Sequence, residues 1–141
     1  MKLFRIVLFL LLLAVLGAAA QTGHQGYVQK SPNKIVVTTQ LSQKLLAQIA
    51  SGDAYLVDVR TAEEYKGSHL KYAKNMDIKS ADFGTEISKL NKNKRVYLYC
   101  RSGSRSGKAT DTLQTFGYKR GYNIGGLDSL AKSGFPLENG H

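Results

Sequence analysis

A lone cysteine followed by a cationic turn is the part of this chain best suited to chemistry. Residues 99–109 read YCRSGSRSGKA, so Cys100 ends an apolar run and a Gly/Ser turn leads from it into a helical pattern. Backbone N–H groups at a helix N-terminus attract anions and lower the pKa of a thiol, and the side chains of Arg101 and Arg105 add two positive charges. We therefore expect Cys100 to be a thiolate.

The turn after Cys100 can point several backbone N–H groups at one atom. Gly103 lets the chain bend tightly without steric cost, and the serine hydroxyls are small additional donors. The residues expected to line this anion-binding turn are Arg101, Ser102, Gly103, Ser104, Arg105 and Ser106. The anion that this turn stabilises is either the sulfur of Cys100 acting as a nucleophile or a bound phosphate or sulfate. A phosphate-binding P-loop would require Gly-Lys-Ser/Thr after four intervening residues, and the absence of that pattern favours the nucleophile.

Strand and helix patterns alternate along the chain and place this turn at a strand-to-helix junction. The segments that resemble strands are 35–37, 54–59, 75–78, 95–99 and 122–124, and helical apolar spacing occurs near 41–49, 63–65, 83–91, 109–116 and 127–130. The sequence therefore predicts an α/β fold with a central, mostly parallel sheet and helices on both faces. In such sheets ligands bind outside the carboxyl ends of strands, which is where Cys100 falls.

The first twenty residues have the pattern of a secretory signal. Lys2 and Arg5 precede the apolar stretch 6–16, and an Ala-x-Ala site predicts cleavage between Ala20 and Gln21. A retained anchor is the weaker alternative, because a spanning helix needs about 20 apolar residues. The expected organisation is a signal peptide at 1–20, a flexible leader at 21–33 and one domain at 34–138. We expect a periplasmic or secreted protein that does not remain in the membrane after cleavage.

Charge and cysteine content argue against several other classes of protein. The chain has 20 basic and 10 acidic residues, a formal net charge of +10 that falls to about +8 without Lys2 and Arg5. The basic residues are scattered rather than clustered, so we expect small anions and no nucleic acid as partners. One cysteine cannot form an internal disulfide, and three dispersed histidines predict no metal site. A monomer held together by packing is expected.

Several motifs occur in order between Ile35 and Leu137. They are LVDVR at 56–60, EEY at 63–65, SHL at 68–70, Ala73 with Asn75, YCRSGSRS at 99–106, and Asn123 with GGL at 125–127. Together they resemble the single-domain rhodaneses, a family of sulfurtransferases. The resemblance implies that Cys100 attacks the outer sulfur of a donor such as thiosulfate, releases sulfite and carries the sulfur as a persulfide. A thiol or cyanide then accepts the sulfur, and no metal or organic cofactor is required.

The resemblance also implies roles for residues around the nucleophile. The backbone amides of Arg101 to Arg105 would stabilise the persulfide, and the two arginine side chains would orient the anionic donor. Asp58 and Arg60 are expected to support the site by forming or sharing ion pairs near the carboxyl edge of the sheet. His69 is expected to make a structural hydrogen bond.

The length of the loop distinguishes this chain from related phosphate enzymes. Rhodanese-fold phosphatases and arsenate reductases resemble the family but place five residues between cysteine and arginine. Four residues lie between Cys100 and Arg105, which favours sulfur over phosphate. Arg101 stands where mercaptopyruvate-specific relatives tend to carry glycine, which favours thiosulfate or another sulfur anion. Ser68-His69 replaces the usual Gly-His pair, so a rearranged turn is expected there.

Two other functions are also compatible with the sequence. Many rhodanese modules have lost their cysteine and act as non-catalytic binding or regulatory domains, although Cys100 and both loop arginines are present here. Alternatively, Cys100 could be a thiol redox centre that forms mixed disulfides with another protein. Turnover with thiosulfate would distinguish the enzyme from both alternatives.

Overall fold

Four parallel strands form the central sheet. The computed structural model describes residues 26–140, and the strands follow the order β3 (Lys74–Asn75), β1 (Ala54–Asp58), β4 (Arg95–Cys100) and β5 (Gly121–Gly126). Every neighbouring pair is parallel, which fits strands that are joined by helical crossovers. Because β1 and β4 are parallel neighbours at the centre of the sheet, the loops that follow them lie side by side at its carboxyl edge.

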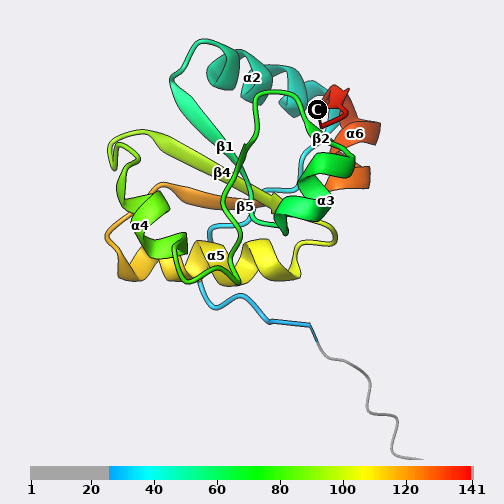
Figure 1. Ribbon diagram of the computed structural model, residues 1–141. Coiled ribbons are helices and arrows are strands. Elements are labelled where there is room, and N and C mark those ends of the chain that lie inside the picture. The colour runs from blue at the N-terminus through cyan, green and yellow to red at the C-terminus, as the bar shows by residue number, and fades with distance from the viewer. Residues whose placement is uncertain (1–25, 141) are drawn as a thin grey trace, which may run out of the picture.

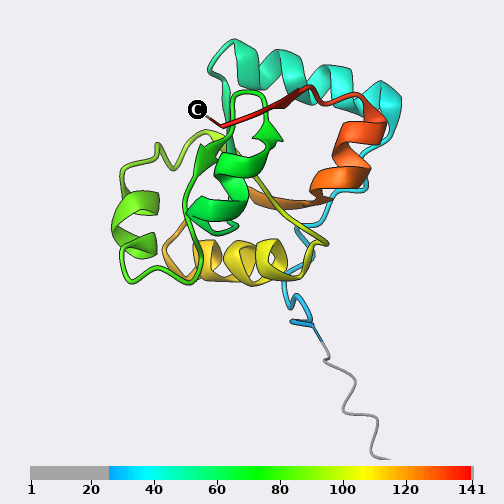
Figure 2. The same ribbon diagram turned by 45° about the vertical axis from the view of Figure 1, so that its right-hand side comes forward.

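Helices cover both faces of this sheet, as Figures 1 and 2 show. The helices α2 (Thr39–Ala50) and α6 (Leu127–Ser133) pack on one face, and α4 (Phe83–Ser88) and α5 (Ser104–Thr115) pack on the other. The predicted α/β fold, with a parallel sheet covered on both faces, is confirmed.

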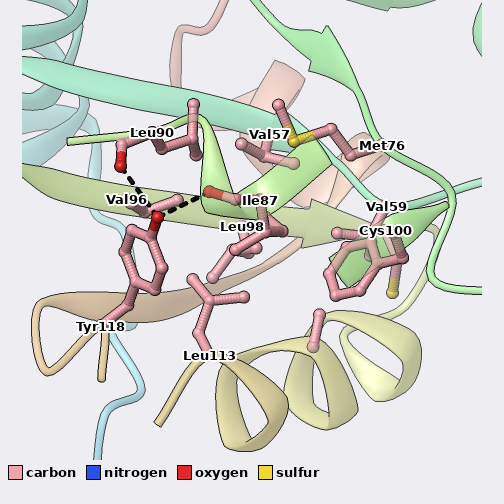
Figure 3. Packing of buried hydrophobic residues seen from close by; sticks show 12 residues of the cluster. Val57, Val59, Met76, Ile87, Leu90, Val96, Leu98, Cys100, Leu113 and Tyr118 are labelled. Carbon is pink, nitrogen blue, oxygen red and sulfur yellow. Dashed lines mark hydrogen bonds between the residues drawn. The ribbon is translucent and has the colours of Figure 1, made fainter. Parts of the chain in front are cut away.

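Side chains of β4 alternate between two hydrophobic clusters, one on each face of the sheet. Cys100 and two aliphatic residues of this strand face α4 and α5, whereas Tyr97 and Tyr99 belong to the cluster under α2 and α6. Figure 3 shows the first cluster, with Cys100 at one end and Tyr118 at the other. The strand therefore directs the thiol towards the face on which α5 lies.

The turn after β1 is held by the short helix α3 (Ala62–Gly67). Thr61 and Glu64 form a capping box: the hydroxyl of Thr61 accepts a hydrogen bond from the Glu64 amide at 3.2 Å, and the Glu64 carboxylate accepts one from the Thr61 amide at 3.0 Å. Beyond this helix, β2 (His69–Leu70) pairs antiparallel with β6 (Leu137–Glu138). The capping box fixes Glu64 close to the carboxyl edge of the central sheet.

Two of the expected strands are absent or shorter than predicted. The segment 35–37 forms no strand: the residue before it, Lys34, makes a single parallel bridge with Asn123, and helix α2 begins almost immediately after it. The strand expected at 75–78 ends at Asn75, the last residue of β3. Beyond Asn75 the amides of Met76 and Ile78 still donate to the carbonyl oxygens of Asp58 and Val59, at 2.9 and 3.2 Å, without continuing the strand.

Residues 26–33, within the expected leader, contain no helix or strand but bond to α5. The backbone amides of Lys30 and Ser31 donate to the carboxylate of Asp111 at 2.7 and 2.9 Å, and the hydroxyl of Tyr27 donates to it at 2.7 Å. The expected signal peptide at 1–20 and the start of the leader lie outside the described residues. Within residues 26–140, no helix is long and apolar enough to cross a bilayer.

Candidate active site

Cys100 is the last residue of β4 and directly precedes the loop that leads into α5. It is buried, with 1% of its surface exposed, and its Sγ accepts hydrogen bonds from the Gly103 amide at 3.0 Å and from the Ser106 hydroxyl at 3.4 Å. Gly103 is the N-cap of α5 and has a φ of +97°, a left-handed conformation that favours glycine. The loop and the first turn of α5 thus surround the sulfur with donors.

These surroundings favour the thiolate of Cys100. Burial alone would raise the pKa of this thiol, but hydrogen bonds from the hydroxyl and amide of Ser106 and from the amides of Ser102 and Gly103 hold the pKa below its usual value. The first turn of α5 carries no acidic residue that would oppose a negative charge. The arrangement therefore favours the anionic form, in which a cysteine is nucleophilic.

Asn123 of β5 ties the loop to the sheet. The Ser106 hydroxyl shares its one proton between Oδ1 of Asn123 at 2.7 Å and the Cys100 sulfur at 3.4 Å. Oδ1 of Asn123 also accepts a hydrogen bond from the Gly125 amide at 3.0 Å, and its Nδ2 donates to the Gly103 carbonyl and the Gln29 side chain, both at 3.0 Å. All four hydrogen bonds of this amide are therefore made, which fixes the position of Ser106 beside the sulfur. The sequence indicates Asn123 only as part of a family motif. Its one local feature is that it is a polar residue within a short predicted strand.

Close contact between the loop and β5 requires glycine at position 126. A Cβ at Gly126 would collide with the carbonyl oxygen of Arg101 and would lie 3.1 Å from the Cα of Ser102. The pairing of β4 with β5 also shifts register near the end of β4, and Gly125 at this point has a φ of +103°. Such an irregularity in a ladder redirects the backbone beside a site.

Asp58 and Arg60 form the ion pair expected at the carboxyl end of β1. The Nη2 of Arg60 lies 2.7 Å from Oδ2 of Asp58 and 2.7 Å from the carbonyl oxygen of Ser68. The hydroxyl of Tyr99 donates to Asp58 at 2.8 Å and accepts a hydrogen bond from the Leu70 amide at 3.0 Å, and burial and the Asp58 charge raise the pKa of Tyr99 far above its usual value. Asp58, Arg60 and Tyr99 thus form a buried frame, whose tyrosine the sequence does not distinguish from packing residues.

Arg105, which the sequence predicts to orient the donor, is paired with Glu64. Its Nη1 and Nη2 lie 2.7 and 2.8 Å from the two carboxylate oxygens of Glu64. The hydrogen bond from Arg105 lowers the pKa of Glu64 to about 2, although partial burial opposes this shift. Arg101 differs, because it is exposed and no ion pair within residues 26–140 holds its guanidinium.

The three loop serines have different surroundings. Ser106 is buried against the sulfur of Cys100, whereas the Oγ of Ser104 accepts a hydrogen bond from the amide of Tyr27 at 2.7 Å. Ser102 is exposed and contributes its backbone amide to the surroundings of the sulfur. Of the three hydroxyls expected at the anion site, only that of Ser106 bonds to the sulfur.

A small cavity opens beside the loop at this edge of the sheet. Its volume is about 280 Å³, and its lining residues are Arg60, Glu64, Gly67, Ser68, Arg101, Leu127 and Asp128. The lining thus includes one member of each arginine–carboxylate pair, Arg60 and Glu64, together with Arg101, which has no ion pair among the described residues. A larger cavity of about 610 Å³ lies between the loop and the segment around Tyr27. Among the described residues, no cluster of histidine, cysteine or acidic side chains could hold a metal ion.

The site and fold together define a rhodanese-like domain, and the chain belongs to that family. Residues 41–133 match the family model for the rhodanese-like domain. Thiosulfate sulfurtransferase PspE of Escherichia coli (strain K12) is 35% identical over 75 residues, which cover 53% of this chain and 72% of that protein. Thiosulfate sulfurtransferase 18 of Arabidopsis thaliana is 38% identical over 104 residues, which cover 64% of this chain and 74% of the relative.

Solved structures give the same family. A rhodanese with anions from E. coli is 31% identical, with a TM-score of 0.54, and the match covers 62% of this chain and 99% of that one. The Alr3790 protein from Anabaena sp. has a TM-score of 0.62 over 70% of this chain and 90% of its own, and at 24% identity it shows the fold alone. The sulfurtransferases among the relatives support a transferase role in sulfur chemistry for this protein.

Proposed function

We propose that this protein is an exported sulfurtransferase that uses thiosulfate or a similar anionic donor. It holds the sulfur on Cys100 as a persulfide and passes it to a thiol or to cyanide. The observation that carries the proposal is the position of the Cys100 sulfur, which accepts hydrogen bonds from Gly103 and Ser106 at the start of α5. Export to the periplasm or the medium is proposed from the signal pattern at 1–20.

In the first half-reaction, the thiolate of Cys100 attacks the outer sulfur of thiosulfate. A new S–S bond forms to Cys100, the S–S bond of the donor breaks, and its electron pair leaves with sulfite. The negative charge then lies on the outer sulfur of the persulfide, which we expect the backbone amides of the loop to stabilise as hydrogen-bond donors. Arg101 attracts the donor into the cavity beside the loop.

In the second half-reaction, a thiolate or cyanide attacks the outer sulfur of the persulfide. The products are a new persulfide or thiocyanate, and the electron pair of the broken S–S bond returns to Cys100 as a thiolate. Both half-reactions balance with the donor, the acceptor and this thiolate. Because the donor product leaves before the acceptor reacts, ping-pong kinetics are expected.

Turnover with thiosulfate and cyanide tests this function. The purified protein should form thiocyanate, with parallel double-reciprocal plots when the two substrates are varied, and Cys100→Ser should form none. Absence of thiocyanate from the wild-type protein would exclude thiosulfate turnover. A protein without turnover that instead forms mixed disulfides through Cys100 would support the redox alternative.

A further inference from the structure

Charges at the cavity beside the loop are largely balanced. Arg60 belongs to the buried frame, and Arg105 is held by both carboxylate oxygens of Glu64. Asp128 also lines the cavity and adds a negative charge. Among the lining cations, Arg101 has no ion pair in the part of the chain that the structure describes. Glu64 lines the cavity and Arg105 does not, so removal of the Glu64 charge would leave the Arg105 charge uncompensated next to the cavity.

The position of Glu64 is fixed from two directions. Its carboxylate Oε2 accepts hydrogen bonds from the amide and the hydroxyl of Thr61, each at 3.0 Å, as part of the capping box of α3. The same oxygen accepts from Nη1 of Arg105, and Oε1 accepts from Nη2. The carboxylate that caps α3 therefore also holds the guanidinium beside the catalytic loop.

We propose that Glu64 determines donor specificity: it screens Arg105 and shifts the preference of the site from doubly charged thiosulfate towards singly charged thiosulfonates, R–SO₂–S⁻. This inference rests on the proposed function, because it concerns the donor step at Cys100. Coulomb energy is proportional to the charge of the donor, so screening a cation weakens the attraction of a dianion about twice as much as that of a monoanion. Leu127 in the cavity wall offers the R group an apolar contact.

Both donor classes undergo the same balanced step. The thiolate of Cys100 attacks the terminal sulfur of the thiosulfonate, the S–S bond between that sulfur and the sulfonyl sulfur breaks, and its electron pair leaves with the sulfinate, R–SO₂⁻. The enzyme is left with the same persulfide that thiosulfate produces. A comparison of the two donors therefore changes their charge while the reacting sulfur stays the same.

The test compares thiosulfate with methanethiosulfonate as donors, with cyanide as the acceptor. The proteins are the wild type, Glu64→Gln and the matched control Glu63→Gln. Glutamine at 64 can keep the capping box, because its amide oxygen still accepts a hydrogen bond from Thr61. Glu63 is an exposed neighbour on α3 without an ion pair among the described residues, so its variant removes one charge without releasing Arg105.

Glu64→Gln should raise kcat/KM for methanethiosulfonate by roughly two- to threefold and for thiosulfate by about the square of that factor, roughly four- to tenfold. Both gains should shrink at high ionic strength, because salt screens exposed charges. Glu63→Gln should keep the wild-type ratio of the two donors. An unchanged ratio in a folded Glu64→Gln variant would overturn the inference and leave the proposed function intact.

Loss of turnover is a distinguishable outcome. A wild-type protein that uses neither donor would overturn the proposed function and the inference together. If Glu64→Gln does not fold, Arg105→Gln decides the question, because it leaves the Glu64 charge unpaired at the cavity. It should lower kcat/KM for thiosulfate by more than that for methanethiosulfonate, and an equal loss for both donors would contradict the role of charge.

Discussion

Two arginine–carboxylate pairs lie beside the loop that follows Cys100, and they differ in burial. In the Asp58–Arg60 pair the side chains are 0% and 6% exposed, whereas in the Glu64–Arg105 pair they are 29% and 23% exposed. A buried charge must keep its partner, because water cannot replace it, whereas a partly exposed pair can be changed at less cost to the fold. The buried pair therefore maintains the structure, whereas the partly exposed pair can be altered to change the charge of the site.

Removal of the buried arginine should have the largest effect. Arg60→Met leaves the carboxylate of Asp58 buried without its cation, and the free energy of unfolding should fall by about 3–5 kcal/mol. The matched variant Arg105→Gln breaks the partly exposed pair and should cost about 1 kcal/mol or less. Urea unfolding of both variants makes the comparison, and equal losses would show that burial does not separate the two pairs.

The tyrosine of the buried frame should have the next largest effect. Tyr99→Phe removes the hydroxyl that bonds to Asp58 and to the Leu70 amide, and should lower the free energy of unfolding by about 1–3 kcal/mol. Tyr97 is its control on the same strand and face, because its hydroxyl bonds to the side chain of Gln48 at a part-buried position. Thermal unfolding should show a smaller loss for Tyr97→Phe. A larger loss would contradict the role of Tyr99 in the frame.

Two serines of the loop allow a similar comparison at the sulfur itself. Ser106→Ala removes a hydrogen bond that stabilises the thiolate, so the pKa of Cys100 should rise, and the rate of alkylation by iodoacetamide at neutral pH should fall by roughly three- to tenfold. Ser104→Ala should leave the pH profile of alkylation unchanged, because the Ser104 hydroxyl bonds to Tyr27. Equal shifts in both variants would mean that Ser106 has no special influence on the sulfur.

The pH dependence of stability should show the smallest effect. The pKa of Glu64 is lowered from 4.5 to about 2 by Arg105, so its ion pair stabilises the fold above its unfolded pKa and loses this contribution as the pH falls from 4.5 to about 2. Because the pair is partly exposed, the contribution should be about 1 kcal/mol or less. The difference in unfolding free energy between wild type and Glu64→Gln should therefore vanish at acidic pH. A difference that grows on acidification would contradict the direction of this pKa shift.

The elements that follow from local rules are visible in the sequence. The apolar runs at 54–58 and 95–100 have one stable arrangement, as inner strands of a parallel sheet, and both form there. The positions of Cys100 and Gly103 can also be predicted, because the end of a strand and a glycine before a helix are recognised from the adjacent residues alone. The bond from Gly103 to the sulfur follows directly from that local geometry.

The remaining features depend on contacts between distant segments. Glu64 and Arg105 are 41 residues apart, and nothing near either residue shows that the guanidinium is paired rather than free. Asn123 joins the loop only because β5 pairs with β4, and Tyr27 reaches Ser104 from a segment without regular structure. Residue type and spacing thus predict which side chains can do chemistry, whereas the fold decides which of them stay available.

Persulfide formation on Cys100 in a single turnover is the most direct test of the proposed reaction. Purified protein is mixed with an equimolar amount of thiosulfate without acceptor, and its intact mass and the released sulfite are measured. The mass should increase by one sulfur atom, one sulfite should be released for each modified chain, and Cys100→Ser should show neither change. An unchanged mass in the wild-type protein, or sulfur that remains bound in the Cys100→Ser variant, would contradict the proposed reaction.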